Sequence, residues 1–350
     1  MSSLLSGKRV LVTGGTGSLG RALVRRLLSG ELGVPESVTV FSRDEAKQHR
    51  MRLEFQHRSV ATDDVRYAER GLLRFRIGDI CDHASVSAAL RHADVVFHAA
   101  ALKQVPACEY QPFEAVKTNI LGAQNIVQAI RDQGLPVETV VGITTDKACK
   151  PVNAMGMTKA LQERILAQAN LELQPTRLLT ARYGNVLASR GSVIPLFHEQ
   201  IRHGGPVTVT TAEMTRFLLS LDDAVDTVFA ALGEGRRGET YIPRAPAVNV
   251  LELAHVLVGD RDVAIEISGV RPGEKTHEIL ISEEEASRTV IRGDYMSVAP
   301  ILPELRTADP GGEPFHGTEY SSGDSLLGRA DIDDLLRRNG LRIEDAPAFN

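Results

Sequence analysis

A carboxylic acid and an amine lie side by side in this chain, at Asp146 and Lys147. Such a pair titrates as a coupled unit, so one member can donate a proton while the other removes one. Thr145 adds a hydroxyl directly before the pair, and Lys159 follows further along. Met155 lies four residues before Lys159, on the same helical face, although a thioether cannot transfer a proton. We expect proton-transfer chemistry here; a surface ion pair is the alternative for Asp146 and Lys147.

The elements that position this stretch follow from its pattern. Residues 137–144 are mostly apolar and predict a strand that ends just before the acid and the base. Pro151 then interrupts the chain, and Asn153 is a good N-cap for a helix over residues 154–169. Ligands of open α/β sheets bind at the carboxyl ends of the parallel strands, so we expect the Asp–Lys pair to lie in such a site.

A glycine motif stands near the start of the chain. Residues 8–13 predict a strand, and the pattern up to about Leu28 predicts a helix, with Gly-x-x-Gly-x-x-Gly between them. Glycines at this spacing allow a tight turn and close approach of the backbone to a pyrophosphate, while the helix N-terminus supplies N–H donors. A purely structural turn is the alternative. We expect a dinucleotide site that includes Gly14, Thr16, Gly17, Ser18, Leu19 and Gly20.

The type of dinucleotide depends on the next strand, predicted over residues 37–41, which ends at Ser42, Arg43 and Asp44. An acidic residue here would accept the ribose 2′-hydroxyl of NAD, whereas an arginine suits the 2′-phosphate of NADP. Lys47 lies about one turn further on and adds positive charge. A solvated Arg43 is the alternative reading, and Asp44 leaves NAD open. We favour NADP, with Ser42, Arg43 and Lys47 as contacts.

Further strands are predicted over residues 72–77, 94–98 and 176–183, and residues 109–133 carry one long helical pattern. Strands that alternate with helices predict an α/β fold with a Rossmann-type, doubly wound parallel sheet. Residues just after two of these strands would face the cofactor, because small side chains let the backbone lie against it and an Asp can reach the adenine amine. These candidates are Asp79, Ile80, Ala99, Ala100, Ala101 and Lys103.

The chain resembles the extended short-chain dehydrogenase/reductase superfamily, on the residues Gly14, Gly17, Gly20, Asp79, Asn119 and Lys159. The resemblance implies that Asn119 and Tyr183 belong to the cofactor site and that Lys159 binds the nicotinamide ribose. The catalytic pair of that superfamily is Tyr-x-x-x-Lys, but Met155 holds the tyrosine position here, and none of the six tyrosines has a lysine four residues on. Either the protein is non-catalytic, or proton transfer has moved to Asp146 and Lys147.

A more specific resemblance covers roughly residues 7–300. The sequence Thr-Thr-Asp-Lys-Ala-x-x-Pro-x-Asn-x-Met-Gly-x-x-Lys at 144–159 is similar to the UDP-N-acetylglucosamine 4,6-dehydratases of capsule and surface-glycan synthesis, one branch of which has Met in the tyrosine position. Motifs at 100–106, 182–186, 189–195, 214–217 and 271–275 continue the match. Asn-Ala-Met-Gly most resembles the inverting enzymes, which also epimerise C5.

This resemblance implies a tightly bound NADP that is regenerated in each turnover. The sugar would give a hydride from C4, Lys147 would remove the C5 hydrogen if the site lowers its pKa enough, and protonated Asp146 would help the C6 hydroxyl leave as water. Return of the hydride to C6 would give a 4-keto-6-deoxy sugar. Asp146, or a water held by Thr145 and Lys159, would accept the C4 hydroxyl proton. The alternatives are a UDP-sugar 4-epimerase or 4-reductase, and a non-catalytic NADP-binding protein.

The second half of the chain is expected to hold the UDP-sugar. Guanidinium groups bind phosphate oxygens bidentately, so Arg216 and Arg271 are candidates for the diphosphate. Glu274 would accept from the uridine ribose hydroxyls, and a strand over residues 206–210 would run against the uracil. Any one of these is more often a surface residue; together they favour a substrate site. The candidates are Lys103, Asn185, Ser192, Val193, Thr208, Val209, Thr210, Arg216, Arg271 and Glu274.

These assignments divide the chain into a mainly NADP-binding Rossmann domain over residues 1–185 and a mainly nucleotide-sugar-binding lobe over 186–310. A C-terminal arm with a short helix, residues 311–350, would latch onto a neighbouring subunit or form a loose tail. The family resemblance implies a homo-oligomer, a dimer or a hexamer.

Composition limits the remaining choices. The net charge of −5 gives no reason to expect nucleic acid. The three cysteines, at spacings that fit no metal pattern, predict reduced thiols and no metal site. The sequence shows neither a signal peptide nor an apolar run near the ~18 residues that span a membrane, so we expect a cytoplasmic protein with no membrane partner.

Overall fold

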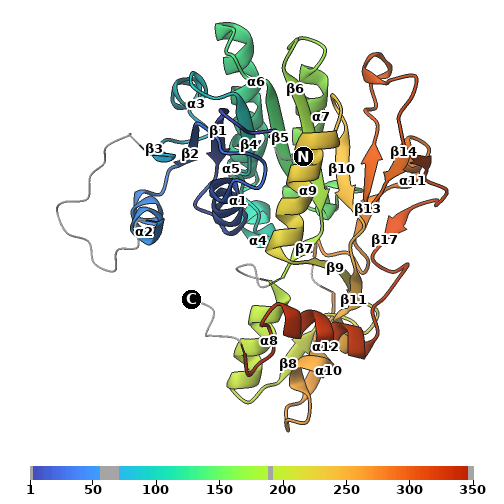
Figure 1. Cartoon of the computed structure of the whole chain (residues 1–350). Coiled ribbons are helices and arrows are strands. Elements are labelled where there is room, and N and C mark those ends of the chain that lie inside the picture. The colour runs from blue at the N-terminus through green and yellow to red at the C-terminus, as the bar shows by residue number, and fades with distance from the viewer. Residues whose placement is uncertain (1–2, 56–70, 188–191, 271, 346–350) are drawn as a thin grey trace.

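A computed structural model of the chain describes residues 3–55, 71–187, 192–270 and 272–345. Within these residues a ten-stranded sheet forms the larger part of the molecule, and a smaller lobe lies at one end of it (Figure 1). The strand order is β16-β14-β15-β10-β6-β5-β4-β1-β2-β3. From β3 to β10 neighbouring strands pair in parallel, and beyond β10 they pair antiparallel. The predicted α/β, doubly wound fold is confirmed.

Six of the seven parallel strands agree with the predicted ones to within two residues at each end, and the seventh, β10, was not predicted. Their bounds are β1 (Arg9–Thr13), β2 (Ser37–Ser42), β3 (Leu73–Ile77), β4 (Val95–His98), β5 (Thr139–Thr145), β6 (Arg177–Tyr183) and β10 (Thr240–Pro243). Side chains alternate between the two faces of the sheet, so Val10 and Val12 enter one apolar core while Leu11 enters the other.

Helices cover both faces of this sheet. On one face lie α1 (Ser18–Ser29), α2 (Glu45–Phe55) and α9 (Leu221–Glu234), and on the other α3 (His83–Leu90), α6 (Gly122–Gln133) and α7 (Ala154–Ala169). The bounds of α7 are those predicted. Its N-cap is Asn153, whose side-chain oxygen accepts from the Gly156 N–H at 2.8 Å. The residues that precede α7 are therefore held in a defined turn at the carboxyl end of β5.

The long helical pattern of residues 109–133 does not form one helix, which corrects the prediction. The chain forms α4 (Val105–Tyr110), α5 (Pro112–Ala115), a π-helical turn η1 (Val116–Leu121) and then α6. Pro112 has no N–H to continue the helix, and Gln111 before it leaves helical geometry with φ −133° and ψ 61°. The apolar spacing continues across this break, so periodicity alone could not reveal it.

The smaller lobe is built on its own apolar core. Its three-stranded sheet has the order β11-β9-β7, and β8 pairs in parallel with β12. Helices α8, α10 and α12 pack around these strands, with Ile332 and Leu336 of α12 fully buried. The bounds are β7 (Asn185–Val186), β8 (Val207–Val209), β9 (Thr215–Leu219), β11 (Ala247–Asn249), β12 (Ile265–Ile267), α8 (Val193–Arg202), α10 (Val250–Val258) and α12 (Arg329–Arg338).

The chain crosses between the two parts more often than the predicted division suggests. From the range 186–310, β10, β14 (Thr289–Arg292) and β15 (Tyr295–Val298) join the main sheet, and α11 (Glu283–Ala286) lies against it. The C-terminal arm adds β16 (Glu313–Pro314) beside β14 and β17 (Tyr320–Ser321) beside β13 (Ile279–Ile281). The short turns η2 (Asp146–Ala148) and η3 (Pro303–Leu305) complete the elements of these residues. These pairings are intramolecular, and a latch onto a second subunit stays a prediction.

Candidate active site

A cleft of about 1550 Å³ runs from the carboxyl ends of the parallel strands to the smaller lobe. One end is formed by the turn after β1 and the loops after β2 to β4, and the other by α8, β8, β9 and residues 272–278. The turn after β5 lies between the two ends. The cleft therefore joins the predicted dinucleotide site to the predicted nucleotide-sugar site through the predicted catalytic stretch.

The glycine turn has the close backbone contacts that a dinucleotide cradle needs. A Cβ on Gly14, where φ is +67°, would lie 2.7 Å from the Ala100 N, and a Cβ on Gly20 would lie 2.5 Å from the Gly14 O. Any side chain at either position would clash with backbone. Helix α1 begins after Gly17, which gives its first N–H groups no side-chain cap, so these donors are available to a phosphate. All six predicted turn residues line the cleft.

The residues around the predicted adenosine site also line the cleft. They are Ser42, Arg43, Lys47, Asp79, Ile80, Ala99, Ala100, Ala101 and Lys103. The Arg43 side chain is 65% exposed, with its guanidinium 3.6 Å from the Asp79 carboxylate. Asp44, in contrast, is engaged at the start of α2, because its two oxygens accept from the Lys47 N–H at 2.9 Å and from the Lys47 ammonium at 2.7 Å.

Asn119 lies elsewhere than its predicted place in the cofactor site. It is fully buried in η1 and is absent from the cleft lining of the described residues. Its amide oxygen accepts from the Leu102 N–H at 2.8 Å, and its amide nitrogen donates to the Leu102 carbonyl at 3.0 Å and to the Thr158 hydroxyl at 2.9 Å. Asn119 thus holds the loop after β4 against α7, and it acts on the cleft only through that loop.

The acid and the base occupy η2, at the end of β5. Asp146 is fully buried, and its Oδ1 accepts from the Thr145 hydroxyl at 2.7 Å and from the Lys147 ammonium at 3.1 Å. The other oxygen, Oδ2, has no hydrogen-bond partner among the described residues. A fully buried carboxyl group excludes the alternative of a surface ion pair.

Glu278 is a third member of this group, and the sequence analysis missed it. Its side chain is buried, with Oε1 3.0 Å from the Lys147 ammonium and 3.8 Å from Nε of Arg216. It lies just beyond the Arg-Pro-Gly-Glu-Lys motif, four residues after Glu274, in a stretch without helical or strand periodicity. The one sequence feature that could have drawn attention to Glu278 is its position beside that motif. That position does not predict a contact with Lys147.

Burial and charge act in opposite directions within this cluster. Burial raises the pKa of Asp146, and the nearby Glu278 charge adds to that effect against the opposing influence of Lys147. Burial alone would lower the pKa of Lys147, but its two carboxyl neighbours outweigh burial and the pKa is raised. For Glu278 the cations Lys147 and Arg216 outweigh burial and lower the pKa. In the ligand-free protein Lys147 is therefore an ammonium.

Lys159 and Met155 lie on α7 as predicted, and both line the cleft. The Lys159 amine donates to the Ile143 carbonyl and to the Gln162 side-chain oxygen, each at 2.8 Å. Burial, which disfavours the ammonium, lowers the pKa of Lys159 to about 8. Met155 packs beside Cys108 in a small apolar cluster.

The substrate candidates gather at the other end of the cleft. Asn185, Ser192, Val193, Thr208, Val209, Thr210, Arg216 and Glu274 line it, together with Tyr183, while Arg271 lies outside the described residues. The buried Arg216 donates to the Thr215 carbonyl at 2.7 Å, which fixes the direction of its guanidinium. Oδ1 of Asn185 and Oγ of Ser192 are buried without a partner among the described residues, as expected of groups that bind a ligand.

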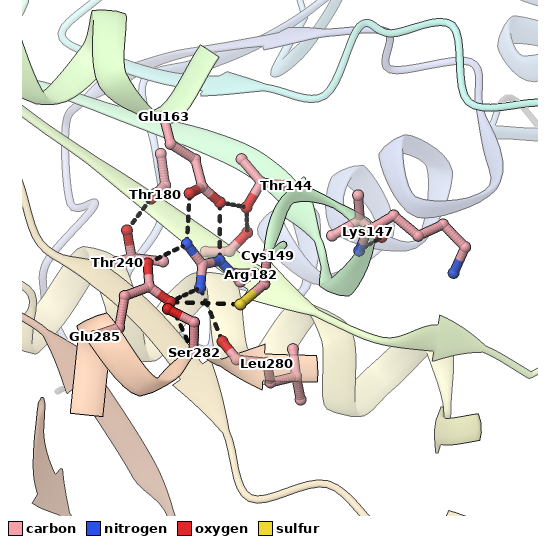
Figure 2. Close-up of polar contacts among 12 residues, drawn as sticks. Thr144, Lys147, Cys149, Glu163, Thr180, Arg182, Thr240, Leu280, Ser282 and Glu285 are labelled. Carbon is pink, nitrogen blue, oxygen red and sulfur yellow. Dashed lines mark hydrogen bonds and ion pairs between the residues drawn. The ribbon is translucent and has the colours of Figure 1, made fainter. Parts of the chain in front are cut away.

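Behind the turn η2 (Asp146–Ala148), called the catalytic turn below because it carries the predicted acid and base, lies a buried charge network (Figure 2). The sequence analysis missed this network as well. Arg182 of β6 donates to Glu163 of α7 at 3.0 and 2.6 Å, and to Glu285 of α11 at 2.7 and 2.9 Å. The Thr144 hydroxyl donates to Glu163 at 2.6 Å, and the Cys149 thiol lies 3.6 Å from Glu285. Figure 2 shows Lys147 pointing away from this network. The network ties α11 to the strands that carry the catalytic turn.

Two further contacts bind residues 272–278 to the catalytic turn. The Lys275 ammonium donates to the Cys149 carbonyl at 2.5 Å, and the Asn153 amide donates to the Gly273 carbonyl at 2.8 Å. Glu278, at the end of this segment, thus has its backbone held beside Lys147. Residues 272–278 and the catalytic turn are therefore held together.

No group of three or more His, Cys, Asp or Glu side chains in the described part of the chain is arranged to hold a metal ion. Nor does any helix there combine the length and the apolarity that crossing a bilayer requires.

Known proteins match this chain along most of its length. A family described as polysaccharide biosynthesis protein matches residues 10–300. A Rickettsia typhi protein named UDP-glucose 4-epimerase is 42% identical over 297 residues, which is 83% of this chain and 82% of the relative. The X-ray structure of Pen from Bacillus thuringiensis is 33% identical with a TM-score of 0.84, covering 96% of this chain and 99% of that one.

A more distant structure shares the fold alone. DesIV, a dTDP-glucose 4,6-dehydratase from Streptomyces venezuelae with NAD bound, is 24% identical with a TM-score of 0.64 over 77% of this chain and 86% of that one. With the family match over residues 10–300 and the cleft described above, the chain belongs to the polysaccharide biosynthesis protein family and has the fold of the nucleotide-sugar epimerases and dehydratases.

Proposed function

We propose that this protein is a UDP-N-acetylglucosamine 4,6-dehydratase that uses NADP. The observation that carries the proposal is the buried Asp146 beside Lys147 in a cleft that joins a dinucleotide cradle to a pocket lined by Arg216. Loss of water from C6 needs a proton donor at the leaving hydroxyl and a base at C5. A non-catalytic protein would have no need for a fully buried acid in contact with a lysine.

The residues of the cradle fit a dinucleotide, and the choice of NADP is supported by how Arg43 and Asp44 differ. Asp44 is occupied as the cap of α2, so it is poorly placed to accept a ribose hydroxyl, whereas the exposed Arg43 guanidinium can pair with a 2′-phosphate. The glycine turn would hold the pyrophosphate and Lys159 the nicotinamide ribose. NADP, when bound, supplies the acceptor for the C4 hydrogen and the donor for C6.

The proton at the C4 hydroxyl needs an acceptor, because Met155 cannot provide one. With its pKa near 8, Lys159 is partly neutral at neutral pH and can receive that proton directly or through a water beside Thr145. Asp146, whose pKa is raised, keeps its proton and can give it to the departing C6 hydroxyl. The two protons are thus handled by two different groups.

The resting structure has no neutral amine ready to act as the base at C5. The sequence analysis assigned it to Lys147 on condition that the site lowers its pKa, but the two carboxyl groups raise it. Lys147 must first pass a proton to Glu278, the ionised one of the two neighbours, whose Oε1 lies 3.0 Å from the Lys147 ammonium. A substrate that covers the remaining exposed 21% of the Lys147 side chain would favour this transfer, because removing water disfavours charge.

The name of the Rickettsia relative makes a UDP-sugar 4-epimerase the second candidate. An epimerase would use the same cradle and the same sugar pocket but would not need a proton donor at C6. The buried, raised-pKa Asp146 favours the dehydratase.

The test is to incubate the purified protein with UDP-N-acetylglucosamine in D₂O and to follow proton NMR. A dehydratase gives a new C6 methyl signal with deuterium at C5, and the coupling constants then show whether C5 inverts. A galacto product without a methyl signal would identify the epimerase. Unchanged substrate, with NADP and UDP binding demonstrated, would refute both. Asp146→Asn should lose the methyl product while it still binds NADP.

A further inference from the structure

Two buried carboxyl groups share one ammonium in the cleft. The Lys147 ammonium contacts Asp146 at 3.1 Å and Glu278 at 3.0 Å, and the two carboxyl groups are 0% and 2% exposed. One ammonium neutralises one carboxylate. Two carboxylates that share a buried ammonium repel each other, so the one with fewer further cations beside it is the one that holds a proton.

The partners of the two carboxyl groups decide which one is protonated. Glu278 has a second cation, because the Arg216 guanidinium lies 3.8 Å from its Oε1. Beyond Lys147, the hydrogen-bond partner of Asp146 among the described residues is the Thr145 hydroxyl, which donates at 2.7 Å. A negative charge is better stabilised by two cations than by one, so it rests on Glu278.

We propose that Glu278 is a positioning residue of the acid–base site, which in the resting protein is ionised between Lys147 and Arg216 and thereby leaves the proton on Asp146. The neutral Asp146 then has Oδ2, an oxygen without a partner among the described residues, to donate to a leaving group in the cleft. The role of Glu278 in turnover rests on the proposed function. The distribution of charge in the resting protein does not.

The other charged groups around the pair agree with this distribution. Burial raises the pKa of Asp146 and the Glu278 charge raises it further, while Lys147 and Arg216 together outweigh burial and lower the pKa of Glu278. Lys159 of α7 and Tyr183 of β6 line the same cleft, and the Lys275 charge acts on both carboxyl groups, so it does not favour one over the other.

The first test needs no substrate. Infrared spectra of the resting protein at neutral pH should show the carbonyl stretch of a protonated carboxyl group, which Asp146→Asn removes. Glu278→Gln should remove it too, because Asp146 is then the only carboxylate beside Lys147 and ionises. Glu278→Asp, which keeps the charge, should retain the band and also guards against a folding defect in the glutamine variant.

The matched control is Glu283→Gln, which removes a carboxylate whose side chain is 68% exposed and lies 3.5 Å from Lys150. It should leave the band unchanged. The proposal is overturned if Glu278→Gln keeps a band that Asp146→Asn loses, or if Asp146→Asn loses none.

The second test is the pH profile of methyl-product formation. Asp146 must be protonated to act, so activity falls as pH rises through its pKa. In Glu278→Gln this limb should move down by about one pH unit or more, and turnover at pH 8 should fall on the order of ten-fold, with NADP affinity unchanged. A lower rate with an unshifted profile would mean a merely structural role. If the wild-type protein forms no methyl product, the proposed function fails, while the infrared result still decides the role of Glu278.

Discussion

Arg182 offers a demanding test of how this fold is held together, because it is fully buried and its guanidinium pairs with two carboxylates at once. Replacing it in Arg182→Met keeps the apolar stem and strands Glu163 and Glu285 in the interior. Breaking a buried pair by removing one partner costs about 3–5 kcal/mol. The pKa of Glu285 gives an independent figure. Burial would raise it, but Arg182 holds it at about 2, against an ordinary 4.5.

A depression of this size in a side chain only 10% exposed corresponds to about 3 kcal/mol of stability, in agreement with the first figure. In the wild-type protein this stabilisation is present above pH 4.5 and is lost as pH falls toward 2. In Arg182→Met the stranded Glu285 carboxylate prefers to be neutral, so its pKa rises and acid relieves the destabilisation. The deficit of the variant should therefore be largest near pH 8 and clearly smaller at pH 5.

The assay is urea unfolding followed by far-UV circular dichroism, since the chain has no tryptophan for fluorescence. Arg177→Met is the matched control on the same strand, because its guanidinium donates to the Gly235 and Leu232 carbonyls and the Thr139 hydroxyl, and among the described residues it donates to no carboxylate. Its deficit should not depend on pH. A deficit below about 1 kcal/mol in Arg182→Met, or one that stays constant between pH 8 and pH 5, would refute the reasoning.

Three further predictions follow from single residues. Arg43→Ala should weaken NADP binding about 10–100-fold and leave NAD binding unchanged in calorimetric titrations, and equal losses for both would argue against a 2′-phosphate contact. Burial, with a smaller contribution from the Lys159 charge, holds the pKa of His98 at about 3; since this is below its ordinary 6.5, the stability it contributes is full above pH 6.5 and declines toward pH 3. His98→Gln should flatten that decline in urea midpoints, and an unchanged slope would contradict the assignment. Gly184→Ala would place a Cβ 2.5 Å from Cβ of Phe217, so it should lower the free energy of unfolding by about 1–3 kcal/mol, and a wild-type urea midpoint would show that the strands can move apart.

Local signals were sufficient for much of the fold. The glycine turn, the N-cap Asn153 and the helix after it were predictable because each depends on residues within one turn of chain. The break before η1 was not, because the apolar spacing continues through Pro112. Asn119 was assigned to the cofactor site by resemblance, but the turn on which it lies directs its amide to Leu102.

Among the site residues, too, those paired with a sequence neighbour were predictable and those that come from distant segments were not. Asp146 and Lys147 are neighbours in sequence, so their pairing could be predicted. Glu278 and Glu285 reach the catalytic region from segments more than a hundred residues further along the chain. Neither carries a periodic pattern that marks it as buried, since an isolated Glu is usually exposed. Their contacts form because the chain folds back from the smaller lobe onto the main sheet. No local stretch of the sequence predicts that path.

The contacts between residues 272–285 and the catalytic turn bear on how this family can diversify. A gene fusion that replaced everything after residue 186 with the corresponding part of a relative would exchange the sugar pocket. It would also exchange Glu278, one of the two carboxyl groups beside Lys147, and Glu285, one of the two that pair with Arg182. New sugar specificity acquired in this way is inherited together with part of the proton chemistry. Variation that leaves chemistry intact is therefore expected in α8 and β8, which line the proposed sugar pocket from the smaller lobe.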